Sequence, residues 1–154
     1  KLGSIYAQQV LGIDNPRVAL LNIGEEEEKG NLVTKSAFEM MKDSTDYTFV
    51  GNVEGHHLFH DKKADVVVCD GFVGNVVLKE AEAFYHLLKK FSPENKFIER
   101  FNSENYGGTP VLGVNKPVII AHGASSPVAI MNMIKQTREV IVSDLCEKIK
   151  QAFM

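Results

Sequence analysis

The sequence predicts an α/β fold built on a mainly parallel sheet. Short apolar runs of strand length alternate along the chain with segments whose apolar residues recur at helical spacing. The most informative example is residues 64–79, where an apolar run ends at Asp70-Gly71 and a helical pattern follows Gly74-Asn75. This order is typical of a buried parallel strand, a tight turn and a crossover helix.

The first half of the chain is expected to alternate strands and helices. The strands are the apolar runs at residues 17–23, 47–50 and 64–69, each followed by glycine, asparagine or aspartate. The helices are residues 3–11, 32–42 and 53–59, the last of them short. The apolar side chains of residues 32–42 recur at helical spacing, which is typical of an amphipathic helix.

The second half is expected to begin with an amphipathic helix that starts near Asn75. Its apolar stripe comprises Val77, Ala81, Phe84, Leu88 and Phe91. Ser92-Pro93 is predicted to cap and open a further short helix, which carries Phe97, Ile98 and Phe101. A last buried strand is expected at residues 117–121. Ser126-Pro127 then opens a long helix whose apolar side contains Met131, Ile134, Ile141, Leu145 and Ile149.

Length and composition are those of one compact domain. The 154 residues are 44% hydrophobic, and the net charge of −3 comes without a dominant basic stripe, which argues against a nucleic-acid-binding protein. Cys69 and Cys146 make neither a disulfide framework nor a metal pair, which favours a reducing cytoplasm. No apolar run approaches the roughly 20 residues that span a bilayer. Lys1 is not a start residue, so we expect the chain to be a fragment of a longer protein.

Small and amide-bearing residues follow the ends of the expected strands. The groups are Asn22-Ile23-Gly24, then Gly51-Asn52, then Asp70-Gly71 with Gly74-Asn75, and finally His122-Gly123 with Ser125. Turns alone favour such residues. The carboxyl ends of parallel strands, however, meet at one edge of a sheet, where α/β proteins bind ligands. Glycines admit close backbone approach and a helix N-terminus attracts anions, so the recurrence predicts a site for a ligand such as phosphate.

Two lysines lie near these turns. Lys29 is in a glycine-flanked loop, and Lys79 follows Asn75 by about one helical turn. Each is either a point charge for a phosphate or a solvated surface residue. The glycine spacing matches neither the dinucleotide fingerprint nor the P-loop, so nucleotide enzymes of those kinds are disfavoured and no cofactor is expected.

Other reactive side chains are weaker candidates. His56, His57 and His60 lack the glutamate of an HExxH motif and, beyond Asp61, a third ligand, so no metal site is expected. Cys69 ends an apolar strand and is interpreted as inert, buried packing. No Gly-x-Ser-x-Gly elbow occurs, so covalent catalysis is not supported.

The order and spacing of several motifs resemble those of a known family. The motifs are residues 17–24 (RVALLNIG) leading through Glu26 to Lys29-Gly30-Asn31, residues 49–55 (FVGNVEG), residues 65–79 (DVVVCDGFVGNVVLK), Tyr106-Gly107-Gly108 and residues 119–123 (IIAHG). Over nearly the whole chain they resemble the C-terminal half of the bacterial phosphate acyltransferase of phospholipid synthesis. In that family, acyl-acyl carrier protein and inorganic phosphate become acyl phosphate and free carrier protein.

The resemblance implies a three-layer α/β/α core related to isocitrate dehydrogenase and phosphotransacetylase, a homodimer, and peripheral contact with the inner face of the membrane. Residues 77–101 fall where the family carries a protruding amphipathic helical pair. This position implies dimer or membrane contact through Phe91, Phe97, Ile98 and Phe101. The chain departs from the family at His56-His57, where Arg-Asp is usual. The family's N-terminal half is absent, so residues 1–154 correspond to its C-terminal portion.

The mechanism implied by the resemblance needs no protein nucleophile, because phosphate attacks the thioester carbonyl directly. Lys29 and Asn75 are expected to hold phosphate. Asn52, His122 and Ser125 are expected to orient the thioester or its oxyanion, with His122 among the catalytic residues. Asp70 is expected to order its turn. The remaining predicted substrate-binding residues are Asn22, Gly71, Gly74, Lys79 and Gly123.

Two alternatives stay open. An enzyme of the related phosphotransacetylase type would use an acyl-coenzyme A thioester in place of acyl carrier protein. A non-catalytic module would hold phosphate through its strand-end amides and would recruit a membrane or a partner through its aromatic helices.

Overall fold

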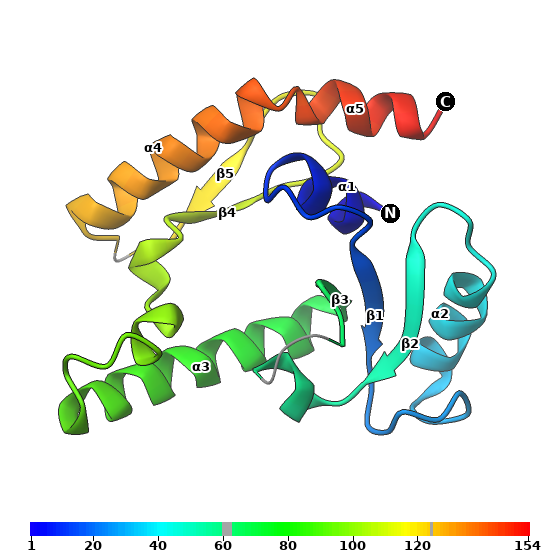
Figure 1. Cartoon of the computed structure of the whole chain (residues 1–154), viewed down its shortest axis with the longest axis horizontal. Coiled ribbons are helices and arrows are strands. Elements are labelled where there is room, and N and C mark those ends of the chain that lie inside the picture. The colour runs from blue at the N-terminus through cyan, green and yellow to red at the C-terminus, as the bar shows by residue number, and fades with distance from the viewer. Residues whose placement is uncertain (60–62, 124) are drawn as a thin grey trace. The chain divides into compact units, whose positions relative to one another are not determined.

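The computed structural model describes residues 1–59, 63–123 and 125–154. They form two compact units, Lys1–Cys69 and Asp70–Met154, which are described separately (Figure 1). The chain is α/β, as predicted, with a parallel sheet of three strands in its described part and with helices, consistent with a three-layer α/β/α fold. None of the described helices combines the length and the apolar character that a membrane span requires.

The first unit contains the parallel sheet. Its elements run in the order α1 (Leu2–Gln9), β1 (Arg17–Leu21), α2 (Leu32–Lys42), β2 (Thr48–Val53), η1 (Gly55–Leu58) and β3 (Val66–Val68). The strand order is β2-β1-β3, so β1 is the central strand and its residues Val18, Ala19 and Leu20 are fully buried. A central parallel strand is covered on both faces, which explains why its sequence is continuously apolar.

The two helices of the first unit have clear local causes. Asn31 caps α2 by accepting a hydrogen bond from the backbone N–H of Thr34 at 2.9 Å. Phe38 on the buried side of α2 meets Phe49 of β2 edge to face, with 5.3 Å between ring centroids. Helix α1 approaches β3 closely, because a Cβ on Gly3 would lie 2.8 Å from a methyl group of Val66.

An ion pair joins the starts of β1 and β3. The Arg17 guanidinium donates to both carboxylate oxygens of Asp65, at 2.9 and 3.0 Å, and the Arg17 backbone N–H donates to the same carboxylate at 2.9 Å. The Asp65 N–H in turn donates to the Arg17 carbonyl. These contacts lower the pKa of Asp65 to about 2, chiefly through the hydrogen bonds from Arg17. The bidentate pair therefore sets the register of β3 on β1.

Strand β2 contains an irregularity at Gly51. Val18 lies opposite Phe49 and Leu20 lies opposite Asn52, so two residues of β2 face the single residue Ala19. This is a bulge, and Gly51 adopts the positive φ of 89° that it requires. The prediction that β2 stops before Gly51-Asn52 is therefore wrong, because the bulge carries the strand on to Val53.

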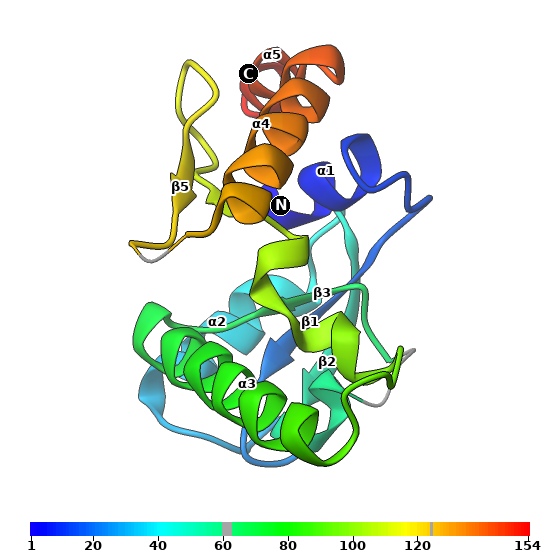
Figure 2. The same ribbon diagram turned by 90° about the vertical axis from the view of Figure 1, so that its left-hand side faces the viewer.

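The second unit combines a long helix, a small antiparallel sheet and a helical C-terminus. Its elements are α3 (Gly71–Phe91), η2 (Ile98–Phe101), η3 (Ser103–Asn105), β4 (Gly108–Pro110), β5 (Ile119–Ala121), α4 (Pro127–Val142) and α5 (Leu145–Ala152). Helix α4 packs on β4 and β5, which lie beside it in Figures 1 and 2. Gly107 is needed at this contact, because a Cβ there would lie 2.3 Å from the Met133 backbone nitrogen.

Helix α3 begins at Gly71, earlier than the predicted start near Asn75. The reason is Asp70, whose carboxylate accepts a hydrogen bond from the Val73 N–H at 3.0 Å and so caps the helix. Ser92 ends α3 instead of opening a second helix, and the described residues between α3 and β4 contain only the short turns η2 and η3 as helical elements. The predicted amphipathic pair is therefore one long helix followed by turns.

The C-terminal part of the second unit also differs from the prediction. Strand β5 pairs antiparallel with β4 in a separate sheet, and its Ile120 is exposed, so it is not a buried strand of the parallel sheet. Ser126 caps α4 with Pro127 at its first turn, as predicted. The expected long helix divides at Asp144, which has a positive φ of 55° and starts α5.

Two predictions about burial are wrong. Cys69 lies just beyond the last residue of β3 and is exposed, so it is not packed in a core. Ile98, expected on an exposed apolar surface, is only 6% exposed because the turn η2 folds it against α3. Phe91 and Phe97 are exposed, as that expectation required.

We predict that Gly51→Ala lowers the free energy of unfolding by about 1–2 kcal/mol, because an L side chain is strained at this positive φ. Gly55→Ala is the matched control, since open space surrounds both Cβ positions but only Gly51 has a positive φ. Urea denaturation of the two variants measures the difference. Equal stabilities would show that the bulge imposes no strain.

We also predict that Asp65→Asn destabilises the protein by about 1 kcal/mol at neutral pH, the upper end for exposed ion pairs. Because the folded pKa of Asp65 is depressed to about 2, its stabilisation is complete above the ordinary carboxyl pKa and is lost as pH falls from about 4 towards 2. The measurement is the free energy of unfolding against pH. Parallel curves for wild type and Asp65→Asn across this range would contradict the prediction.

Candidate functional site

Two buried asparagines face each other at the carboxyl ends of β1 and β2. Asn22 is 8% exposed and Asn52 is 5% exposed. The Asn22 Nδ2 donates to the Asn52 Oδ1 at 3.2 Å. The Gly51 bulge makes this contact, because it places Asn52 opposite Leu20, and Asn22 lies two residues beyond Leu20 on the same face.

The asparagine pair also holds the loop at residues 23–31. Asn22 Nδ2 donates to the backbone carbonyl of Lys29 at 3.1 Å, and Asn52 Nδ2 donates to that of Glu26 at 2.9 Å. Asn22 Oδ1 accepts from the Ile23 N–H at 2.9 Å. Both amide hydrogens of Asn22 are therefore used within the protein, so its role is to position the loop.

Gly30 lets this loop close over the asparagines. It has a positive φ of 94°, and a Cβ there would lie 2.4 Å from the Asn22 Oδ1 and 2.1 Å from the Thr34 hydroxyl. The Lys29 side chain is exposed and lies across Gly24, whose Cβ would be 2.7 Å from the Lys29 Cγ. The loop thus brings the stem of the Lys29 side chain to Gly24, just beyond the carboxyl end of β1, where α/β folds bind ligands.

A second group of predicted residues comes together within the second unit. The Lys79 ammonium of α3 donates to His122 Nε2 at 3.3 Å and to the Glu82 carboxylate at 2.7 Å. The ammonium has no acceptor, so His122 Nε2 accepts this hydrogen bond. Ser125 donates through its hydroxyl to the His122 carbonyl at 2.6 Å and closes the turn after β5.

The remaining predicted residues lie in the first turns of α3. Gly71 starts the helix, and the Gly74 N–H already donates to the Asp70 carbonyl at 3.0 Å. Gly74-Asn75 is therefore not the helix N-terminus as predicted, and the Gly74 backbone N–H is already used within the helix. Within the described part of the chain, the exposed Asn75 side chain hydrogen bonds no other predicted site residue. Gly123 lies in the exposed turn after β5.

The predicted convergence of all strand ends at one sheet edge is also wrong. The carboxyl ends of β1, β2 and β3 share an edge because these strands are parallel neighbours. His122-Gly123 follows β5, which belongs to the antiparallel sheet of the other unit. Sequence alternation alone did not distinguish a parallel strand from a short antiparallel one.

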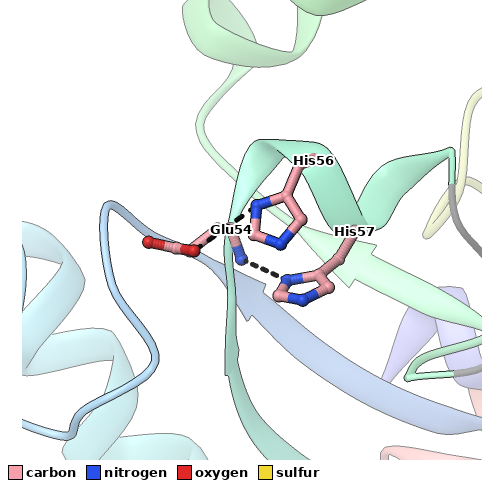
Figure 3. Close-up of side chains that lie close together, drawn as sticks. All are labelled: Glu54, His56 and His57. Atoms are coloured by element: carbon pink, nitrogen blue, oxygen red, sulfur yellow. Dashed lines mark hydrogen bonds and ion pairs between the residues drawn. The ribbon is translucent and has the colours of Figure 1, made fainter.

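A cluster of titratable side chains lies just after β2, at the turn η1 (Figure 3). It comprises Glu54, His56 and His57, whose potential ligand atoms lie within 4.8 Å of one another. Glu25 of the neighbouring loop approaches it, with its Oε1 3.3 Å from the His57 Nε2. His60 and Asp61, also considered from the sequence, lie outside the described residues.

Charges around Glu25 keep this loop carboxylate ionised. Its pKa is lowered mainly by a hydrogen bond from the Lys63 ammonium, with smaller contributions from His57 and His56. The sequence reasoning missed Glu25, whose partners come from distant segments, and Glu54, which lies at a turn of unpredicted geometry. It also missed Glu82, although its spacing of three residues from Lys79 on the predicted helix was visible. The spacing of Glu54 to His56-His57 was a further available signal.

Each unit contributes one group of polar side chains with a chemistry of its own. In the first unit a lysine is held at a sheet edge by buried amides, and in the second unit an imidazole is hydrogen bonded to an ammonium. Such groups supply positive charge and hydrogen-bond donors without a covalent step.

Comparisons with known proteins identify the family to which the chain belongs. The sequence profile of a family described as "Fatty acid synthesis protein" matches residues 1–95 and 87–148 of the chain. The chain is 44% identical to a protein named "Phosphate acyltransferase" from Halothermothrix orenii, covering 97% of this chain and 51% of that protein.

Other curated relatives carry the same name. The protein from Caldanaerobacter subterraneus subsp. tengcongensis is 40% identical, and that from Listeria welshimeri serovar 6b is 44% identical. Each alignment covers 97% of this chain and 50% of the relative. The chain spans about half the length of these curated relatives. Because the profile covers almost all of its residues, the chain belongs to the family of fatty acid synthesis proteins.

Proposed function

We propose that the full-length protein transfers a fatty acyl group from acyl-acyl carrier protein to inorganic phosphate and so forms acyl phosphate for phospholipid synthesis. The observation that carries this proposal is the identity of 40–44% with proteins named phosphate acyltransferase, across 97% of this chain. The resemblance of its motifs to that family names the acyl donor and the product.

The proposed reaction is a direct displacement at the thioester carbonyl. A phosphate oxygen forms a bond to the carbonyl carbon, the negative charge passes through the carbonyl oxygen, and the carbon–sulfur bond then breaks. The thiolate of the carrier protein leaves and takes up a proton. The protein has to hold two substrates in line and stabilise the oxyanion, and no side chain forms a covalent bond.

Lys29 is the proposed phosphate-binding residue of the first unit. Its backbone carbonyl is fixed by Asn22, and its loop is fixed a second time by Asn52 through Glu26. The fixed backbone limits the region that the Lys29 ammonium can reach, and the ammonium provides a point charge for phosphate. Asn22 and Asn52 are positioning residues in this proposal.

His122 is the proposed thioester-orienting residue of the second unit. The hydrogen bond from Lys79 fixes one of its ring nitrogens, and Ser125 orders the turn that carries it. Asp70 orders the start of α3 as its capping residue, and Asn75 lies on the same helix. Asn75 is proposed to add an amide donor for phosphate, with Gly71, Gly74 and Gly123 leaving room for close approach.

The exposed aromatic side chains favour peripheral contact with the inner face of the membrane, or a homodimer, for the full-length protein. Phe91 is 80% exposed and Phe97 is 55% exposed. Lys90 precedes Phe91 on α3 and is also exposed, so apolar and basic groups occur together. This combination is typical of a helix that lies on an anionic lipid surface.

The experiment is an acyl phosphate assay on the full-length protein with acyl-acyl carrier protein or acyl-coenzyme A as donor. We expect turnover with the carrier-protein donor. Lys29→Ala is expected to raise the KM for phosphate about 10- to 100-fold, the loss of one charge-assisted hydrogen bond.

Lys35→Ala is the matched control for this variant, because Lys35 is an exposed lysine on α2 without a predicted role. Turnover with acyl-coenzyme A alone would favour the phosphotransacetylase alternative. Liposome binding without acyl phosphate formation would favour the non-catalytic module. An unchanged KM for phosphate in Lys29→Ala would show that Lys29 does not bind phosphate.

A double-mutant cycle tests whether Asn52 acts through the Lys29 loop. Asn52→Ala is expected to raise the phosphate KM, because the Glu26 carbonyl loses its donor and the loop shifts. The effect of Lys29→Ala with Asn52→Ala is expected to be smaller than the product of the single effects. Asn115→Ala, at an exposed loop of the second unit, is the control. Fully multiplicative effects would show that Asn52 does not position Lys29.

A further inference from the structure

The histidine cluster at η1 has no part in the proposed acyl transfer. Glu54, His56 and His57 belong to one short turn, and each offers a ligand atom within 4.8 Å of the others. In Figure 3 both imidazole rings turn a nitrogen towards Glu54. The proposed acyl transfer does not account for two imidazoles and a carboxylate that lie together on one turn.

Hydrogen bonds determine which nitrogen of His57 is protonated. Its Nδ1 accepts from the backbone N–H of Glu54 at 3.2 Å, so a lone pair points towards Glu54. Its Nε2 lies 3.3 Å from the Glu25 Oε1, so the proton on this nitrogen has a carboxylate beside it. A metal-binding histidine has this same pattern, with one nitrogen towards the ion and the other N–H on a carboxylate.

The distance between His56 and Glu54 also fits a shared cation. The His56 Nδ1 lies 3.4 Å from the Glu54 Oε2. Two ligand atoms on a tetrahedral zinc ion, at bonds of about 2.0–2.1 Å, are about 3.3 Å apart. The two side chains therefore need little movement to bind one ion.

The backbone of η1 holds the ligands in place before any ion binds. The Glu54 carboxylate accepts from the His57 N–H while the His57 ring accepts from the Glu54 N–H, which forms a reciprocal capping box. The turn follows directly on β2, whose last residue Val53 is buried. The hydrogen bond from the His57 N–H to the Glu54 carboxylate persists when an ion binds, whereas the one to the His57 ring is exchanged for the bond to the metal.

We propose that Glu54, His56 and His57 bind a divalent transition-metal ion, with zinc as the best match. Mixed imidazole and carboxylate ligands suit zinc, whereas magnesium and calcium prefer oxygen ligands alone. The ion replaces the Glu54 N–H as the partner of His57 Nδ1. The protonated Nε2 of His57 stays beside Glu25, and the fourth coordination position of the ion is left for water.

Isothermal titration of the full-length protein with zinc chloride tests the proposal. We expect His56→Ala to lose one zinc equivalent, or to bind that equivalent at least about 100-fold more weakly, because one of three ligands is gone. His56 takes no part in the capping hydrogen bonds, so this variant is expected to fold. His86→Ala removes an exposed histidine on α3 and is expected to bind zinc as the wild type does.

Glu54→Gln provides a second variant that keeps the turn, because its amide oxygen still accepts from the His57 N–H. It is expected to weaken the same zinc equivalent by about tenfold or more, and magnesium is expected to produce no matching heat in the wild type. The proposal is overturned if His56→Ala and Glu54→Gln bind zinc with wild-type stoichiometry and affinity. It is also overturned if His86→Ala loses the same equivalent.

Discussion

The hydrogen bond between Asn22 and Asn52 is the contact on which the candidate site of the first unit depends. It joins the ends of two parallel strands and, through the remaining amide hydrogens, fixes the backbone at Glu26 and Lys29. Buried amides are costly unless they are satisfied, so this small network strongly favours a single loop conformation. Buried amide groups therefore fix the backbone from which the exposed Lys29 side chain extends.

This network in turn depends on the backbone conformation of a single residue, Gly51. If β2 paired with β1 without the bulge, Gly51 would lie opposite Leu20 and the Asn52 side chain would point to the opposite face of the sheet. The bulge therefore turns the Asn52 side chain to the face of the sheet on which Asn22 lies. The same strand then leads directly into η1, where Glu54, His56 and His57 gather.

The loop before Lys29 is strongly acidic. The loop carries four consecutive glutamates before Lys29, an arrangement that opposes anion binding unless the acidic groups are engaged elsewhere. Of these four carboxylates, that of Glu25 pairs with Lys63 and lies beside His57, which offsets part of the negative charge. In the second unit, Glu82 and His122 both accept hydrogen bonds from the Lys79 ammonium.

The sequence alone determined the α/β class, the positions of most elements and the small, polar residues after the strands, because these follow from local periodicity and turn chemistry. Helix α2 has the predicted bounds of residues 32–42, whereas the start of α3 was missed although the capping residue Asp70 was visible. Only the tertiary structure decided that β5 joins a separate antiparallel sheet and that Cys69 is exposed. It alone brought Asn22 to Asn52 and Glu25 to His57, because strand pairing and a one-residue bulge depend on contacts between segments distant in the chain.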